Sequence, residues 1–145
     1  MALKWKSPQE DEVALANLGM PSSFLTIVFP NRPPQDPEYI DLESLSPAKR
    51  ERWKKTVKRF YQHLTYLQPG RLILKSPQHT WRLKILLEMF PNARFVHMVR
   101  DPFIVFPSTV HFWKTMYLLH GLQTPNFKTL NEYEFENLLS MNRKL

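Results

Sequence analysis

The sequence contains no cysteine and very little glycine. Its 145 residues include only three glycines, Gly19, Gly70 and Gly121, and no two of them lie close together. A glycine-rich phosphate-binding loop needs two or three closely spaced glycines, so this chain contains no such loop. The lack of cysteine excludes disulfides, thiolate catalysis and cysteine-ligated zinc.

Long hydrophobic runs are also missing. The longest uncharged stretch, residues 13–31, is interrupted by Asn17, Gly19 and Pro21, which argues against a membrane span. The first residues lack the apolar segment of a signal peptide. These absences lead us to expect a cytoplasmic protein without a membrane span.

Positive charge is in excess, and apolar residues are abundant. The chain has 20 Lys and Arg against 13 Asp and Glu, a net charge of +7 that attracts anionic ligands. With 43% hydrophobic residues it can bury a core. We expect a single domain over residues 1–145, with a proline-rich loop at about residues 30–41.

Two helices are predicted in the first half. Residues 7–18 begin with Ser7 as N-cap and Glu10 at the third helical position, the spacing of a capping box. The second helix begins after Ser46, a cap followed by Pro47, and extends to about residue 67. Apolar residues at helical spacing predict its buried face: Trp53, Val57, Phe60, Leu64 and Leu67.

The second half alternates between two kinds of pattern. Short apolar runs at about 71–75 and 94–99 predict strands, and each is followed by a helical pattern. Strand, helix, strand and helix with short connections predict a βαβ unit, and hence an α/β fold with a parallel sheet. In the last of these helices, Phe106, Val110, Trp113 and Tyr117 lie on one face.

Matching residues follow the two predicted strands. Lys75-Ser76-Pro77 follows the first, and Arg100-Asp101-Pro102 follows the second. Each sequence puts a cation at a strand end beside a helix N-terminus, where phosphate groups bind in α/β proteins. Ser108 lies about two helical turns beyond Arg100, so both can contact one phosphate. Taken singly, each cation is as readily explained as a solvated side chain.

These motifs resemble a known enzyme family. The segments Leu74-Lys-Ser-Pro-Gln-His-Thr, Phe90-Pro-Asn-Ala-Arg-Phe-Val-His-Met-Val-Arg-Asp-Pro and Phe106-Pro-Ser are similar to part of the nucleotide site of sulfotransferases. Those enzymes use 3′-phosphoadenosine 5′-phosphosulfate (PAPS), and the resemblance is to the tyrosylprotein sulfotransferase and microbial branch. It implies a partial P-loop-like parallel sheet, with Arg100 and Ser108 on the 3′-phosphate and Lys75 near the sulfuryl group.

The resemblance also suggests a general base. Some members of the family use a glutamate, which points to Glu10, with Glu12 as the second choice. The capping box explains Glu10 equally well. His79, close after Lys75, is another candidate, although a histidine in a first helical turn is commonly just surface. The other histidines show no ligand spacing, so we expect no metal site.

The resemblance is incomplete, which leaves several alternatives open. The family's Arg-Ser-Gly-Thr-Thr-type loop around the 5′-phosphosulfate is not found, so we expect a truncated domain, and whether it turns over is left open. One alternative is a module that only binds adenosine 3′,5′-bisphosphate. Another, which we favour less, is nucleic-acid binding by the basic residues 49–59. An incomplete sheet would also expose an edge, leaving the isolated chain marginally stable unless another chain covers that edge.

Overall fold

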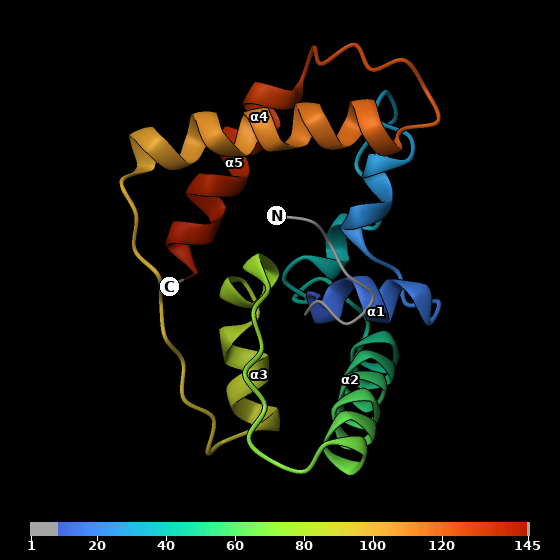
Figure 1. The fold of residues 1–145 in the computed structure, drawn as a ribbon, viewed down its shortest axis with the longest axis vertical. Coiled ribbons are helices and arrows are strands. Elements are labelled where there is room, and N and C mark those ends of the chain that lie inside the picture. The colour runs from blue at the N-terminus through green and yellow to red at the C-terminus, as the bar shows by residue number, and fades with distance from the viewer. Residues whose placement is uncertain (1–8, 145) are drawn as a thin grey trace.

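The computed structural model describes residues 9–144, in which every regular element is a helix. The α-helices are α1 (Asp11–Asn17), α2 (Pro47–Leu67), α3 (Leu83–Met89), α4 (Pro102–His120) and α5 (Leu130–Arg143). Three short 3₁₀ helices are η1 (Ser23–Ile27), η2 (Pro37–Tyr39) and η3 (Pro77–Thr80). Figure 1 shows α1, α2 and α3 in one half of the molecule, with α4 and α5 in the other.

The predicted α/β fold with a parallel sheet is wrong for the described residues. The segments at 71–75 and 94–99 are irregular connections, and their backbones make no hydrogen bond to another backbone group within residues 9–144. Figure 1 shows the connection from α3 to α4 running along the outside of the molecule, away from the connection between α2 and α3. The two segments share an apolar sequence pattern, but they do not lie side by side in the structure.

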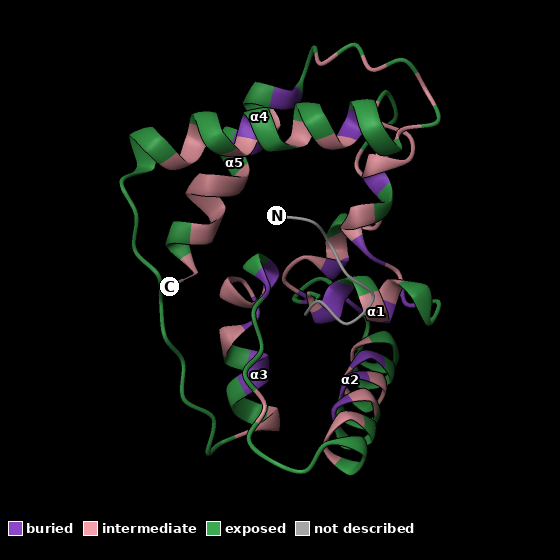
Figure 2. Ribbon diagram, viewed as in Figure 1, coloured by how far each residue is buried: buried purple, intermediate pink, exposed green. Residues whose placement is uncertain are grey.

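The strand prediction failed because a segment forms a strand in a sheet only when it has partner strands to pair with. A short apolar run indicates that a segment can form a strand, but parallel strands also need hydrogen-bonded neighbours and cover on both faces. Here Ile73 is 94% exposed and Val96 is 84% exposed, and both segments are largely exposed in Figure 2. Within the described residues there is thus no sheet edge for another chain to cover, although apolar side chains are exposed.

The predicted helix starts agree better with the structure than the predicted strands do. Ser46 caps α2 by accepting a hydrogen bond from the Lys49 N–H, as predicted from the sequence. The first helix begins at Asp11, later than expected, and the predicted cap Ser7 lies outside the described residues. Glu10 occupies the N-cap position of α1, but its side chain makes no capping hydrogen bond. The side chain of Glu10 is therefore free to interact elsewhere.

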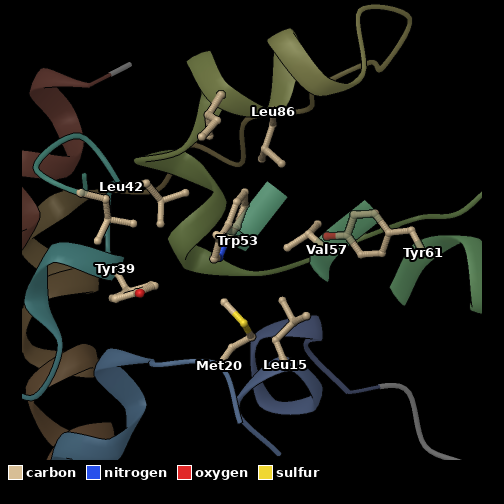
Figure 3. Close-up of a cluster of buried hydrophobic side chains, with 10 residues drawn as sticks. Leu15, Met20, Tyr39, Leu42, Trp53, Val57, Tyr61 and Leu86 are labelled. Carbon is tan, nitrogen blue, oxygen red and sulfur yellow. The ribbon is translucent and has the colours of Figure 1, made fainter. Parts of the chain in front are cut away.

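The main core lies between α1, α2, α3 and the chain around η2. Trp53 and Val57 of α2 are buried as predicted, whereas the predicted Leu67 is 78% exposed and Tyr61 is buried instead. Figure 3 shows Leu15 of α1 and the other labelled side chains gathered around Trp53. This core fixes the start of α1 against the segment that precedes α3.

A smaller core joins α4 to α5. Its buried members are Val110, Tyr117 and Leu130, and the predicted stripe residues Phe106 and Trp113 pack against them. α4 continues through Pro107 as one helix and ends before Gly121. A Cβ on Gly121 would lie 2.4 Å from the carbonyl oxygen of Tyr117, so only glycine fits at this helix end. No helix among residues 9–144 is both long and apolar enough to cross a membrane.

Candidate functional site

Three consecutive acidic residues at the start of α1 each meet a different basic side chain. The pairs are Glu10 with Lys75, Asp11 with His79, and Glu12 with Arg82. The three basic residues lie just before η3, within η3 and at the N-cap position of α3, in that order. We call these six residues the acid–base row.

The exposed end of the acid–base row is the pair of Glu10 and Lys75. The Lys75 ammonium donates a hydrogen bond to the Glu10 carboxylate. The Lys75 side chain is 78% exposed and that of Glu10 is 23% exposed, so both can be reached from solvent. The pair borders a cavity of about 270 Å³ whose walls include Phe60, Leu64 and Leu72. A carboxylate and an ammonium thus meet at the edge of a partly apolar cavity.

Asp11 occupies the middle of the acid–base row and is buried. The Tyr61 hydroxyl donates a hydrogen bond to it, and His79 Nε2 lies 3.0 Å from its Oδ2 atom. Burial alone would raise the pKa of Asp11, but the hydrogen bond and charge of His79, together with the Tyr61 hydroxyl and the Glu12 N–H, lower it below its ordinary value. Burial and then the nearby Asp11 charge raise the pKa of Tyr61. Asp11 is thus an anion that accepts a hydrogen bond from Tyr61 and lies beside His79.

Arg82 holds the buried end of the acid–base row. It is 1% exposed, and its Nη1 atom lies 2.6 Å from Glu12 Oε2. Its Nε donates to the Ile40 carbonyl at 2.9 Å, and its guanidinium carbon lies 5.1 Å from the Trp53 ring centroid. The Ser22 hydroxyl donates to Glu12 at 2.7 Å. Glu12 is thus fully engaged and inaccessible, which favours Glu10 over Glu12 as an acceptor of protons.

The predicted phosphate-binding residues lie elsewhere. Arg100 is exposed immediately before α4, and Ser108 is exposed on α4. Asp101 caps this helix by accepting from the Phe103 N–H at 2.9 Å, as predicted. Among residues 9–144 no hydrogen bond or ion pair joins Arg100 or Ser108 to Glu10 or Lys75. The structure therefore brings together one half of the predicted site and leaves the other half at the start of α4.

Two functional candidates were missed in the sequence. Arg82 gave no signal in the sequence, because its burial depends on contacts with Glu12 and the Ile40 carbonyl. Glu134 is 5% exposed in α5, and its Oε1 atom has no hydrogen-bond partner among the described residues. Burial raises the pKa of Glu134 to about 7. It lies four residues after the buried Leu130, which places its carboxylate on the buried side of α5.

The basic helix α2 has the arrangement expected of a solvated charged face. Lys55, Lys58 and Arg59 are exposed, while Trp53 and Val57 point into the core. Trp53, the aromatic residue within the basic stretch 49–59, is buried and unavailable for stacking on a base, which weakens the nucleic-acid interpretation.

Comparison with known proteins defines the class. A family model described as "Sulfotransferase family" matches residues 22–144, so the chain belongs to the sulfotransferase family. Its sequence is 48% identical, over all 145 residues, to the omega-hydroxy-beta-dihydromenaquinone-9 sulfotransferase Stf3 of Mycobacterium bovis. The same holds for the protein of that name from Mycobacterium tuberculosis. The chain spans 37% of the length of these relatives. No solved structure matches it.

Proposed function

We propose that the protein transfers a sulfuryl group from PAPS to a hydroxyl or amine acceptor. The sulfur–oxygen bond to the phosphate of PAPS breaks, a new bond forms from sulfur to the acceptor atom, and adenosine 3′,5′-bisphosphate leaves. The acceptor proton must go to a base. The observation that carries this proposal is the accessible pair of Glu10 and Lys75 in a chain of the sulfotransferase family.

Glu10 and Lys75 have complementary roles in this reaction. The Glu10 carboxylate takes the acceptor proton as the new bond forms. The Lys75 ammonium, the more exposed of the two, turns to the bridging oxygen and neutralises the charge that develops there. While substrates are absent, the two side chains neutralise each other. His79 lies beside Asp11 and its side chain is largely buried, so it is the weaker candidate for the base.

The nucleotide end of the donor is assigned to the start of α4. Arg100 offers a guanidinium for two parallel hydrogen bonds to the 3′-phosphate, and Ser108 offers a hydroxyl. The partial positive charge of the helix N-terminus adds to that of Arg100. The exposure of both side chains and the family membership support this assignment.

An alcohol is the favoured acceptor. The relatives are named as sulfotransferases of an omega-hydroxy menaquinone derivative, which carries a hydroxyl group. The alternative of binding without transfer is supported by the lack of contact between Arg100 and the pair of Glu10 and Lys75 in the described residues. The two functions give different results in a transfer assay.

Transfer of ³⁵S from labelled PAPS to a hydroxylated acceptor tests the proposal. Lys75→Met removes the charge at the bridging oxygen and is expected to lower the rate about 10²-fold. Glu10→Gln removes the base and is expected to lower the rate by at least about 10²-fold. The control is Lys144→Met, which removes a half-buried lysine paired with Asp41 and Glu43 and should leave the rate unchanged.

Two results would contradict the transfer reaction. One is full activity in Lys75→Met. The other is a wild-type chain that binds adenosine 3′,5′-bisphosphate but transfers no label, which would establish the binding-only alternative.

A further inference from the structure

A second cavity lies away from the acid–base row. It measures about 540 Å³, within the range of about 300–1,000 Å³ typical of small-molecule sites. The proline-rich loop forms one wall, and the chain between α4 and α5 forms another. Tyr117, Phe127 and Tyr133 give it aromatic surface. We call this cavity the loop pocket.

Asn31 ties the two walls of the loop pocket together. Its side-chain amide donates to the Thr124 carbonyl at 2.9 Å, and its Oδ1 atom accepts from the Asn126 N–H at 3.0 Å. Its own N–H donates to Gln123 Oε1 at 3.2 Å. The walls are thus joined without a ligand, and a preformed pocket loses less conformational freedom on binding.

The loop pocket differs from the rest of the molecule in its charge. Its charged lining residues are two cations, Arg32 and Lys128, and two acids, Glu132 and Glu136. The four charges add up to zero, whereas the whole chain carries a net charge of +7. Glu132 also lies in the first turn of α5, where it offsets the positive end of that helix. The lining therefore gives no net attraction for an anion such as the nucleotide.

The polar groups on the aromatic wall are neutral hydroxyls. Burial, followed by the nearby charge of Glu134, raises the pKa of Tyr117 to about 12, and burial also raises that of Tyr133. Both phenols remain protonated at neutral pH, so they can donate and accept hydrogen bonds. A ligand with an apolar body and a hydroxyl group would match this lining.

We propose that the loop pocket is a second ligand site, which binds an uncharged alcohol with an apolar body. The site goes beyond the proposed function, because it lies away from the acid–base row, where Glu10 takes the acceptor proton. The loop pocket is linked to the acid–base row through η1, since Thr26 lines the pocket and Ser22, just before η1, donates to Glu12. Ligands would thus be separated by charge: the anionic nucleotide at exposed cations and the neutral alcohol in the charge-balanced pocket.

Calorimetric titration with 1-octanol and with octyl phosphate tests the charge argument. The two probes share an apolar chain and differ in charge. The titrations use a chain that carries Arg100→Ala and Lys75→Met, which lacks the cations proposed to hold the nucleotide. This chain is expected to bind 1-octanol about tenfold more tightly than octyl phosphate. Adding Glu132→Lys and Glu136→Lys makes the lining cationic and is expected to reverse that preference. Tighter binding of octyl phosphate without the two added lysines would overturn the proposal.

Two further measurements locate the probe. Thr129→Trp puts a large side chain on the lining and should weaken 1-octanol binding about tenfold, while Thr115→Trp on the exposed side of α4 should not. On the wild type, NMR shifts of Tyr117 and Tyr133 should move on titration. Equal binding by both variants, or shifts confined to other residues, would overturn the assignment.

Titration with adenosine 3′,5′-bisphosphate separates this inference from the proposed function. A wild type that binds the nucleotide but not 1-octanol overturns the loop pocket alone. A wild type that binds 1-octanol in the loop pocket but not the nucleotide overturns the proposed function and leaves the loop pocket as a separate alcohol site.

Discussion

Replacing Arg82 with methionine is expected to lower the free energy of unfolding by about 3–5 kcal/mol. The substitution keeps an apolar stem but removes the guanidinium that pairs with Glu12 and donates to the Ile40 carbonyl. Glu12 is 3% exposed, so its charge would be left buried with only the Ser22 hydroxyl as a side-chain donor. Urea denaturation followed by circular dichroism measures the loss.

A surface pair provides the matched control for Arg82. Lys54 lies 3.3 Å from Glu88 in an exposed ion pair, and Lys54→Met should cost only about 0–1 kcal/mol. Combining Arg82→Met with Glu12→Leu removes both buried charges and should restore part of the lost stability. If Arg82→Met is no more destabilising than Lys54→Met, the buried end of the acid–base row does not hold α1 in place.

The stability of the wild type is expected to fall as pH rises from about 4.5 to about 7, because of Glu134. Burial raises the pKa of this residue from 4.5 to about 7. Between these values the unfolded chain loses the Glu134 proton while the folded chain retains it, so a higher pH favours unfolding. The difference corresponds to about 3 kcal/mol. Below 4.5 both states are protonated, and well above 7 both are ionised, so the contribution becomes constant.

Glu134→Gln isolates this effect, because glutamine has nearly the same shape and does not titrate. The variant should lack the fall in unfolding free energy and be more stable than the wild type at pH 8. Glu132→Gln, at an exposed position of the same helix, should keep the wild-type pH profile. Chemical denaturation at several pH values measures all three proteins. Parallel profiles for Glu134→Gln and the wild type would show that Glu134 is not held protonated by burial.

Local signals in the sequence predicted the helices well. Asp101 and Ser46 cap α4 and α2, as their positions before a proline indicated. Ser76 has the same sequence context, yet its hydroxyl makes no capping bond at the start of η3. A cap contacts only the next turn of the chain, which explains why such signals can be read locally.

Features that depend on distant contacts were harder to predict. The strands predicted from the apolar runs around Ile73 and Val96 were wrong, and nothing in either run encodes a pairing partner. The meeting of Glu10 with Lys75 was implied only by the family resemblance. The burial of Arg82 and Glu134 depends on packing between elements, and a charged residue is ordinarily expected on the surface.

The most direct test of this account is calorimetric titration of adenosine 3′,5′-bisphosphate into the wild type and Arg100→Ala at one fixed salt concentration. The control is Arg94→Ala, an exposed arginine in the same connection before α4. We expect the wild type and the control to bind equally. Arg100→Ala should bind about tenfold or more weakly, since a charged phosphate contact contributes about 1.5–3 kcal/mol. A folded wild type without binding, or equal binding by all three proteins, would contradict a nucleotide site at the start of α4.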